Sequence, residues 1–350
     1  MSKGNLLLIG NYLASPRHNR NVWHALAERL TASGWNVITT SSREDKAARL
    51  LGMLTTVLKE KNRYQLAQID VFSGQAFIFA EICTCLLNIL HKPVILTLHG
   101  GGLPEFASRH PRRVRRLFHK VEEVVTPSPF LQQDLKPYRK DIRIIPNPTD
   151  VSRSIYRQRI QAAPNLIWVR SFHSVYNPSL PVRVVKELTT DFPATRLTMI
   201  GPDKGDGSLE RMMSLVADLR VEEQIEVIPG VPHAEIPAYL DRGDIFINSS
   251  NYDTAPRSLL EAMANGLCIV STNVGGVPWL VEDQVEGLLV PPGNPQAMSA
   301  AVRRILLDPE LAARLSENAR RKSEKYDWHS ILPQWESLFT EVIEAHHGKS

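Results

Sequence analysis

The sequence predicts an α/β protein with two domains, each built on a parallel β-sheet. Short apolar runs typical of buried strands alternate with helical patterns along the whole chain, which favours parallel strands joined by right-handed crossovers. A polar segment at residues 150–163 has no apolar periodicity and separates two complete series of such elements. The 350 residues are enough for two domains with separate cores. We therefore expect two Rossmann-like halves that face each other across a cleft.

The first half of the chain, residues 1–152, contains the elements of one domain. An apolar run at residues 6–9 predicts a buried strand, and residues 19–33 carry apolar side chains at helical spacing before Gly34. Residues 75–90 are largely apolar, which predicts a buried helix. The other elements expected here are strands at 37–39, 69–72, 93–98 and 123–126, a helix at about 46–61, and a closing segment at 142–148.

The second half repeats the alternation in a domain at residues 163–330. Strands are expected at 165–169, 197–200, 225–228, 245–248 and 268–271, with helices between them. A charged surface helix is expected at 309–326. The last helix, at about 331–346, has Trp335, Leu338, Phe339 and Val342 on one face, and residues 331–350 are treated as a separate terminal segment.

Composition limits the class of protein. The chain is 43% hydrophobic and 22% charged, which is typical of a soluble globular protein, and its formal net charge of +4 does not indicate nucleic-acid binding. The three cysteines, Cys83, Cys85 and Cys268, lie in apolar runs without histidines at metal-ligand spacing. We expect reduced thiols packed in the core, with no disulfide and no zinc site. No run approaches the ~20 apolar residues of a membrane span, and the first residues lack the layout of a signal peptide, so we expect a cytoplasmic protein.

Residues 248–293 contain the pattern with the most chemistry. A loop carrying Asp253 leads into a helix with Pro256 near its first turn, where a missing N–H costs nothing. Gly266 ends this helix, a short buried strand follows, and the pair Gly275–Gly276 lies at the carboxyl end of that strand. Parallel α/β sheets bind ligands at this edge.

The start of this helix is suited to a phosphate. The backbone N–H groups of residues 257–259 lack helical partners and lie at the positive end of the helix dipole. Asp253 and Glu261, eight positions apart, flank that position. Carboxylates repel a phosphate but accept hydrogen bonds from hydroxyls. A diphosphate between two polyols, as in a nucleotide sugar, therefore fits the pattern.

The same stretch resembles the retaining, metal-independent glycosyltransferases of glycosyltransferase family 4, which have the GT-B fold. The family signature combines two acidic residues separated by seven positions with an Ala-Met-Ala-x-Gly run, a Gly-Gly turn and a Gly-Leu-Leu-Val-Pro-Pro segment. In this chain the motifs are Asp253-x7-Glu261, Ala262-Met263-Ala264-Asn265-Gly266, Gly275-Gly276 and Gly287-Leu288-Leu289-Val290-Pro291-Pro292. Asp253 departs from the family pattern, because it stands in place of the first glutamate.

The resemblance implies roles for individual residues. It places His99 against the donor sugar, Arg170 on the diphosphate, Asp253 on the sugar and Glu261 on the ribose hydroxyls, and makes His99, Arg170 and Asp253 the catalytic candidates. It also implies that the last helix crosses back to the first domain. The donor that the resemblance implies is a UDP-sugar or GDP-sugar, with no cofactor and no metal ion. The donor-binding candidates are Gly100, Asn147, Val231, Pro256, Arg257, Ser258, Leu259 and Glu261.

Two further positions depart from the family. A lysine usually follows the arginine by about five residues, but residues 171–178 contain none, and Lys204 is either its substitute or a solvated loop lysine. The first glycine-rich loop usually contains a Gly-Gly turn, whereas this chain has Gly10 followed by Asn11 and Tyr12. Asn11 and Tyr12 are acceptor-side candidates.

A basic block at Arg109 to Lys120 has three interpretations. It is a solvated helix face, a docking surface for anionic lipid, or a site for an anionic acceptor such as a lipid-linked diphosphate. Nucleic acid is the weaker alternative, because Phe118 is the sole aromatic residue among the basic ones.

We interpret the sequence as a retaining hexosyltransferase of polysaccharide or glycolipid biosynthesis that acts on a glycan or lipid-linked acceptor. If the basic block docks on anionic lipid, the protein is peripheral on the inner face of the membrane. Catalysis would be electrostatic, without a protein nucleophile. A GT-B nucleotide-sugar epimerase or synthase and a non-catalytic sugar-nucleotide binding subunit remain alternatives. A nicotinamide dehydrogenase is not supported, because residues 201–207 do not match Gly-x-Gly-x-x-Gly.

Overall fold

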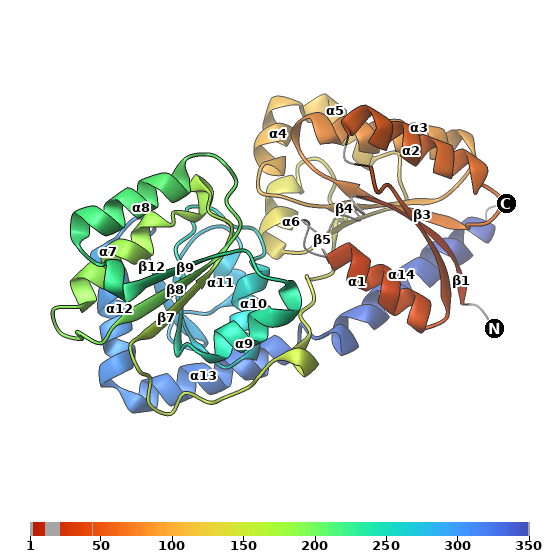
Figure 1. The fold of residues 1–350 in the computed structure, drawn as a ribbon. Coiled ribbons are helices and arrows are strands. Elements are labelled where there is room, and N and C mark those ends of the chain that lie inside the picture. The colour runs from red at the N-terminus through yellow and green to blue at the C-terminus, as the bar shows by residue number, and fades with distance from the viewer. Residues whose placement is uncertain (1–2, 11–21, 44, 349–350) are drawn as a thin grey trace. The chain divides into compact units, whose positions relative to one another are not determined.

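The computed structural model describes residues 3–10, 22–43 and 45–348, and the chain forms two compact units (Figure 1). One unit consists of Met1–Asn147 with His329–Ser350, and the other of Pro148–Trp328. The first unit therefore contains both ends of the chain, whereas the second is one continuous segment.

The first unit is built on a six-stranded parallel sheet with the order β2-β1-β3-β4-β5-β6. Its centre is buried on both faces, since every residue of β3 is buried, as expected of a parallel sheet covered by helices. In register, Ile69 of β3 lies opposite Leu96 of β4. The strands are β1 (Gly4–Ile9), β2 (Trp35–Thr40), β3 (Leu66–Val71), β4 (Val94–Leu98), β5 (Glu123–Thr126) and β6 (Arg143–Ile144).

Helices cover both faces of this sheet, and several begin at recognisable caps. The Asp45 side chain accepts a hydrogen bond from the Ala48 amide at the start of α2, and Ser128 does the same for Leu131 at the start of α6. The helices are α1 (Val22–Ala32), α2 (Lys46–Lys59), α3 (Phe77–Ile89), α4 (Leu103–Arg109), α5 (Pro111–Phe118), α6 (Pro129–Leu135) and the C-terminal α14 (Trp328–His347).

The C-terminal helix α14 packs on the first unit, as predicted. Trp335 contacts Trp23 of α1 with ring centroids 6.1 Å apart, and Phe339 contacts Trp35 of β2 at 5.9 Å. The Glu336 carboxylate accepts hydrogen bonds from the Trp35 indole at 3.1 Å and the Ser33 hydroxyl at 2.6 Å. The apolar face read from the sequence is thus buried against α1 and β2.

The second unit has the same kind of sheet, in the order β12-β11-β10-β7-β8-β9. Alternate residues of β7 enter separate cores on its two faces, Trp168 on one and Ile167 on the other. The strands are β7 (Asn165–Val169), β8 (Arg196–Gly201), β9 (Ile225–Pro229), β10 (Ile245–Asn248), β11 (Cys268–Thr272) and β12 (Gly287–Val290). The helices are α7 (Ser179–Leu188), α8 (Ser208–Leu219), α9 (Ile236–Asp241), α10 (Arg257–Ala264), α11 (Val277–Leu280), α12 (Pro295–Leu307) and α13 (Pro309–Glu324).

The polar segment at residues 150–163 is anchored to the second unit by Arg159. The Arg159 side chain is fully buried and donates to the backbone carbonyls of Gly243, at 2.8 Å, and Asn265. Burial and the neighbouring charge of Arg157 lower the pKa of Arg159 to about 10. A charged residue in a polar stretch therefore fixes this stretch to the domain.

Two sequence predictions about burial are wrong. The helix at 75–90 buries only one face, because Ile78, Ile82 and Ile89 of α3 are exposed. Cys83 and Cys268 are buried, but Cys85 lies on the outer face of α3. A helix in the outer layer of the domain needs only one face against the sheet, so its apolar composition does not imply complete burial.

The basic block predicted as one helix face is divided between two helices. Helix α4 ends at Arg109, and α5 begins at Pro111.

In the described part of the chain, no helix is long and apolar enough to cross a membrane.

Candidate active site

The loop between β10 and α10 is held in place by the paired glycines. The Gly276 amide donates to the Asp253 carbonyl at 2.8 Å. A Cβ on Gly275 would lie 2.0 Å from the Asp253 carbonyl oxygen, and a Cβ on Gly276 would lie 1.9 Å from that of Thr254. Only glycine permits this approach, because any side chain would collide with the loop backbone. The Gly-Gly turn thus fixes the backbone position of Asp253.

Helix α10 presents its amino end and two polar side chains at this loop. The amides of Arg257, Ser258 and Leu259 are in the first turn, where helical geometry leaves N–H groups without partners. Among the described residues, the buried Ser258 Oγ and Arg257 Nε have no hydrogen-bond partner. Buried polar atoms are normally satisfied, so these two groups and the amides suit a polar ligand.

Glu261 lies inside α10, and its carboxylate is close to a histidine and an arginine. Its Oε1 is 2.8 Å from His233 Nε2 and 3.7 Å from an Arg257 nitrogen. Burial raises the pKa of Glu261, but the hydrogen bond with His233 and the charge of Arg257 outweigh it, and the pKa is lowered overall. The carboxylate is therefore ionised and able to accept hydrogen bonds from hydroxyls.

Arg170 follows β7 and forms an ion pair with Asp253. Its guanidinium also lies over the Tyr176 ring, 5.0 Å from the centroid. Gly201 makes this position possible, because a Cβ there would lie 1.7 Å from the Arg170 carbonyl oxygen. The structure thus brings together Arg170 and Asp253, which are 83 positions apart in the sequence.

Lys204 is exposed on the turn after β8, next to the loop after Arg170. Its amide donates to the Phe172 carbonyl at 3.1 Å. Asp206 on the same turn accepts from the Ser174 amide at 2.8 Å, and hydrogen bonds from Ser208 and Ser174 lower the pKa of Asp206. The turn that carries Lys204 is thus hydrogen-bonded to the loop after Arg170.

His99 lies in the first unit, directly after β4. Its Nε2 is 3.2 Å from Oδ1 of the buried Asp70. The ring contacts Trp23 and Phe72, with centroids 4.6 and 5.2 Å away. Gly100, with φ of 83°, lets the chain turn immediately after the histidine.

The remaining candidates are distributed over both units. Asn147 is half-buried at the end of the first unit, and Val231 is half-buried after β9 in the second, against the core that includes Leu259. Asn11 and Tyr12 lie outside the described residues.

Residues 157–322 match the family profile described as Glycosyl transferases group 1, and residues 20–153 match that of Glycosyltransferase Family 4. The chain belongs to glycosyltransferase family 4. It is therefore a glycosyltransferase, as the sequence motifs predicted.

Several proteins are similar to this glycosyltransferase in sequence or in fold. A D-inositol 3-phosphate glycosyltransferase of Thermobispora bispora is 21% identical over 334 residues, which cover 87% of this chain and 78% of the relative. Sucrose-phosphate synthase of Thermosynechococcus elongatus has a TM-score of 0.82 at 19% identity, covering 98% of this chain and all of that one. Anabaena HepE, solved in complex with UDP and glucose, has a TM-score of 0.77 at 16% identity, covering 97% and 100%. These structures support the GT-B fold predicted for the chain.

Three neighbours of the candidate residues were not singled out from the sequence. His233 contacts Glu261, Tyr176 supports Arg170, and Asp70 contacts His99. His233 follows the candidate Val231 by two positions, which was the only available signal. Tyr176 and Asp70 lie in stretches of sequence that carry no motif.

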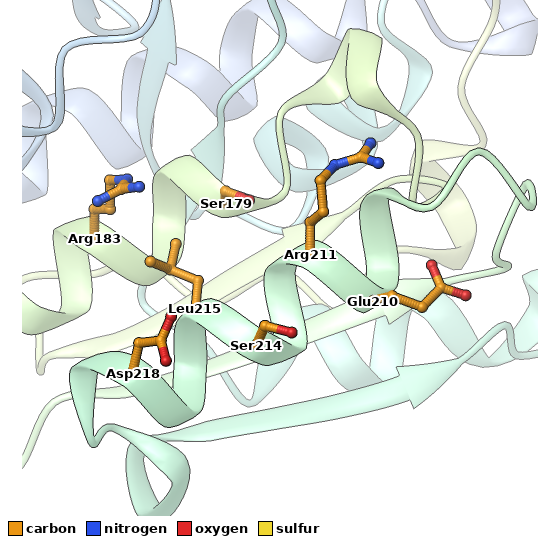
Figure 2. A pocket seen from close by; sticks show the side chains of 7 residues that line it. All are labelled: Ser179, Arg183, Glu210, Arg211, Ser214, Leu215 and Asp218. Carbon is orange, nitrogen blue, oxygen red and sulfur yellow. The ribbon is translucent and has the colours of Figure 1, made fainter.

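A cavity of about 440 Å³ lies elsewhere, between α7 and α8 (Figure 2). It shares no residue with the site around Arg170, Asp253 and Glu261. Two arginines and two acidic residues among its lining side chains offset each other in charge. The lining residues are Ser179, Arg183, Glu210, Arg211, Ser214, Leu215 and Asp218.

Proposed function

We propose that this glycosyltransferase moves a sugar from a nucleotide diphosphate sugar to a hydroxyl of a glycan or lipid-linked acceptor, with retention of configuration. The observation that carries the proposal is the grouping of Arg170, Asp253, Glu261 and the amino end of α10 within one unit. It combines an anion site with carboxylates that accept hydrogen bonds from hydroxyls. The UDP complexes of Anabaena HepE support a nucleotide donor by analogy.

Each group has a place in this proposal. Glu261 accepts hydrogen bonds from the ribose hydroxyls, and Arg170 and the amides of residues 257–259 bind the diphosphate. Asp253 accepts a hydrogen bond from the sugar. A guanidinium carries five N–H donors, so Arg170 can contact a phosphate while it keeps its pair with Asp253. The pair therefore orients Arg170 for the diphosphate.

The proposed reaction is electrostatically assisted. As the bond from the anomeric carbon to the diphosphate breaks, its electron pair remains on the phosphate oxygen, where Arg170 and the α10 amides stabilise the charge. The sugar acquires oxocarbenium-like character. The acceptor oxygen forms the new bond on the face that the diphosphate leaves, and its proton passes to the departing diphosphate. His99 is proposed to contact the donor sugar.

Donor binding without a metal ion is the first expected result. Arg170 and the amino end of α10 supply positive charge, and the sequence has no Asp-x-Asp motif. UDP or GDP at ~100 times its Kd should stabilise the protein by about 2.7 kcal/mol, equally with and without EDTA. Thermal unfolding and donor turnover measure this. Loss of turnover on chelation that Mn²⁺ or Mg²⁺ restores would contradict the metal-independent mechanism.

The product distinguishes the remaining alternatives. Transfer with an unchanged anomeric configuration, read by NMR, supports the retaining transferase. A nucleotide sugar with an inverted sugar carbon would indicate an epimerase. Binding of the donor without hydrolysis or transfer would indicate a non-catalytic sugar-nucleotide binding subunit. The absence of the family's lysine and the aspartate at position 253 are the features that motivate this alternative.

We also propose that the basic block Arg109 to Lys120 contacts an anionic membrane, which would place the protein on the cytoplasmic face. Arg113 is engaged with Glu81, and Arg109 pairs with Glu105. Arg112, Arg115, Arg116 and Lys120 are exposed, but Arg115 lies over the Tyr138 ring, 5.9 Å from its centroid. Arg112, Arg116 and Lys120 are therefore the residues most available to lipid headgroups.

A further inference from the structure

Helix α3 carries an exposed apolar stripe. Its outer face presents Ile78, Ile82, Cys85 and Ile89, at spacings of four, three and four positions. The three isoleucines are 41%, 37% and 69% exposed. The opposite face packs into the domain core through residues such as Phe77 and Leu87. The stripe is thus additional to the face that the fold requires.

Helix α2, the neighbour of α3, also carries exposed apolar side chains. Leu51 and Leu58, one heptad apart, are 60% and 47% exposed, and α2 packs against α3. In the described part of the first unit, every large hydrophobic residue that is exposed lies on α2 or α3. On the surfaces of soluble proteins, exposed large hydrophobic residues normally occur singly, so their grouping on two neighbouring helices indicates an interaction surface.

Basic residues border the stripe on the side of α5. Arg113 of α5 binds the Glu81 carboxylate of α3 at 2.6 and 3.1 Å, and Asn88 of α3 donates to the Lys120 carbonyl at 3.0 Å. Figure 1 shows α2, α3 and α5 on the same side of the sheet. Arg112 and Arg116 are exposed one helical turn apart on α5.

We propose that the α2–α3 stripe, defined as Leu51, Leu58, Ile78, Ile82, Cys85 and Ile89, enters the interfacial region of an anionic bilayer while Arg112, Arg116 and Lys120 bind its headgroups. This deepens the proposed membrane contact by adding apolar insertion to charge attraction. Charge complementarity favours an anionic lipid over a second copy of the chain. A two-fold pair would bring the same basic border close to itself.

Cys85 provides a native reporter on the stripe. It is exposed, whereas Cys83 and Cys268 are buried and burial raises the pKa of each to about 12. A thiol-reactive, environment-sensitive fluorophore should therefore label Cys85 selectively in the full-length protein. Vesicles containing phosphatidylglycerol should shift its emission to the blue, and acyl-chain-brominated lipids should quench it.

Variants of the unlabelled protein distinguish the insertion of apolar side chains from the attraction between basic residues and lipid headgroups. Arg112→Gln with Arg116→Gln should weaken sedimentation with the vesicles, by roughly fivefold for each arginine engaged. Ile78→Ser with Ile82→Ser should remove the binding that persists at high salt. The matched control is Leu307→Ser with Arg304→Gln, an exposed pair in the second unit. It should change neither the sedimentation with vesicles nor the binding that persists at high salt.

Three outcomes would overturn the proposal. They are unchanged emission with anionic vesicles at low salt, equal binding to neutral vesicles, and a blue shift without lipid that grows with protein concentration. The last would indicate self-association. UDP or GDP binding, measured in parallel, shows whether the donor site is intact whichever result is obtained.

An independent observation concerns the buried neighbour of His99. Asp70 Oδ1 accepts a hydrogen bond from Gln68 at 2.9 Å and lies 3.2 Å from His99 Nε2. Gln68 also donates to Thr97 at 2.7 Å. Gly10 approaches from β1, where a Cβ would lie 2.2 Å from Asp70 Oδ2. Asp70 Oδ1 is thus held between Gln68 and His99, whereas the buried Oδ2 has no hydrogen-bond partner among the described residues.

We infer that Asp70 is a positioning residue for His99, which rests on the proposed role of His99 with the donor. A carboxylate only accepts, so its hydrogen bond with neutral imidazole places the proton on Nε2 and leaves Nδ1 as an acceptor. Trp23 and Phe72 on the ring restrict its rotation. Tautomer and orientation are therefore set together.

Asp70→Asn is expected to lower kcat about tenfold with little change in donor KM. Nitrogen NMR of the His99 ring should show loss of the Nε2–H tautomer. In a His99→Ala background, Asp70→Asn should cause no further loss of kcat. If His99→Ala alone keeps full turnover, the proposed role of His99 is wrong. If His99→Ala impairs turnover but Asp70→Asn does not, the positioning role is wrong and the proposed function stands.

Discussion

Asp253→Ala is expected to lower turnover about ten- to a hundredfold and to change nucleotide diphosphate affinity far less. The proposed partner of Asp253 is the sugar, and loss of a hydrogen bond to a charged group costs roughly 1.5–3 kcal/mol. Aspartate is one methylene shorter than the family's glutamate. The Gly275–Gly276 turn holds the Asp253 backbone directly, which favours a loop position that compensates for the shorter side chain.

Calorimetry with UDP or GDP and steady-state rates with the full donor test this expectation. Asp253→Asn is the matched variant, because it keeps the size and removes the charge that pairs with Arg170. Normal turnover of Asp253→Ala would reduce the residue to a loop cap and would indicate a differently organised catalytic site.

Glu261→Ala is expected to weaken the binding of the nucleotide itself, by about ten- to a hundredfold. The carboxylate is the proposed acceptor for both ribose hydroxyls, and nucleoside diphosphate and full donor share the ribose. Because the pKa of Glu261 is lowered, the carboxylate loses its charge only as pH falls below the ordinary glutamate range. Its contribution to binding should therefore be constant at neutral and mildly acidic pH.

Titration calorimetry with UDP or GDP, repeated across that pH range, measures the effect. Glu261→Gln keeps one oxygen acceptor, and His233→Ala removes the neighbour while it leaves the carboxylate. We expect both variants to bind more strongly than Glu261→Ala. Unchanged affinity in Glu261→Ala would remove the residue from the ribose site.

Much of the fold followed from the sequence because its signals are local. The alternation of short apolar runs and helical patterns predicted two parallel sheets, and the apolar face of residues 335–342 predicted a packed terminal helix. The structure has both. Helix α3 was misread, because apolar composition shows that a helix can be buried but not how many of its faces are covered.

The motif residues of the candidate site were readable because Asp253, Glu261 and Gly275–Gly276 lie close together in the chain. The contacts between distant segments were not: Asp70 meets His99, and Arg170 meets Asp253. Asp70 lies in β3 and His99 directly follows the neighbouring strand β4, and only the strand order brings them together. The sequence thus determined the family, most of the elements and the candidate residues of the proposed anion site. The tertiary structure decided which charges pair and which apolar face stays uncovered, since both depend on the packing of segments far apart in the chain.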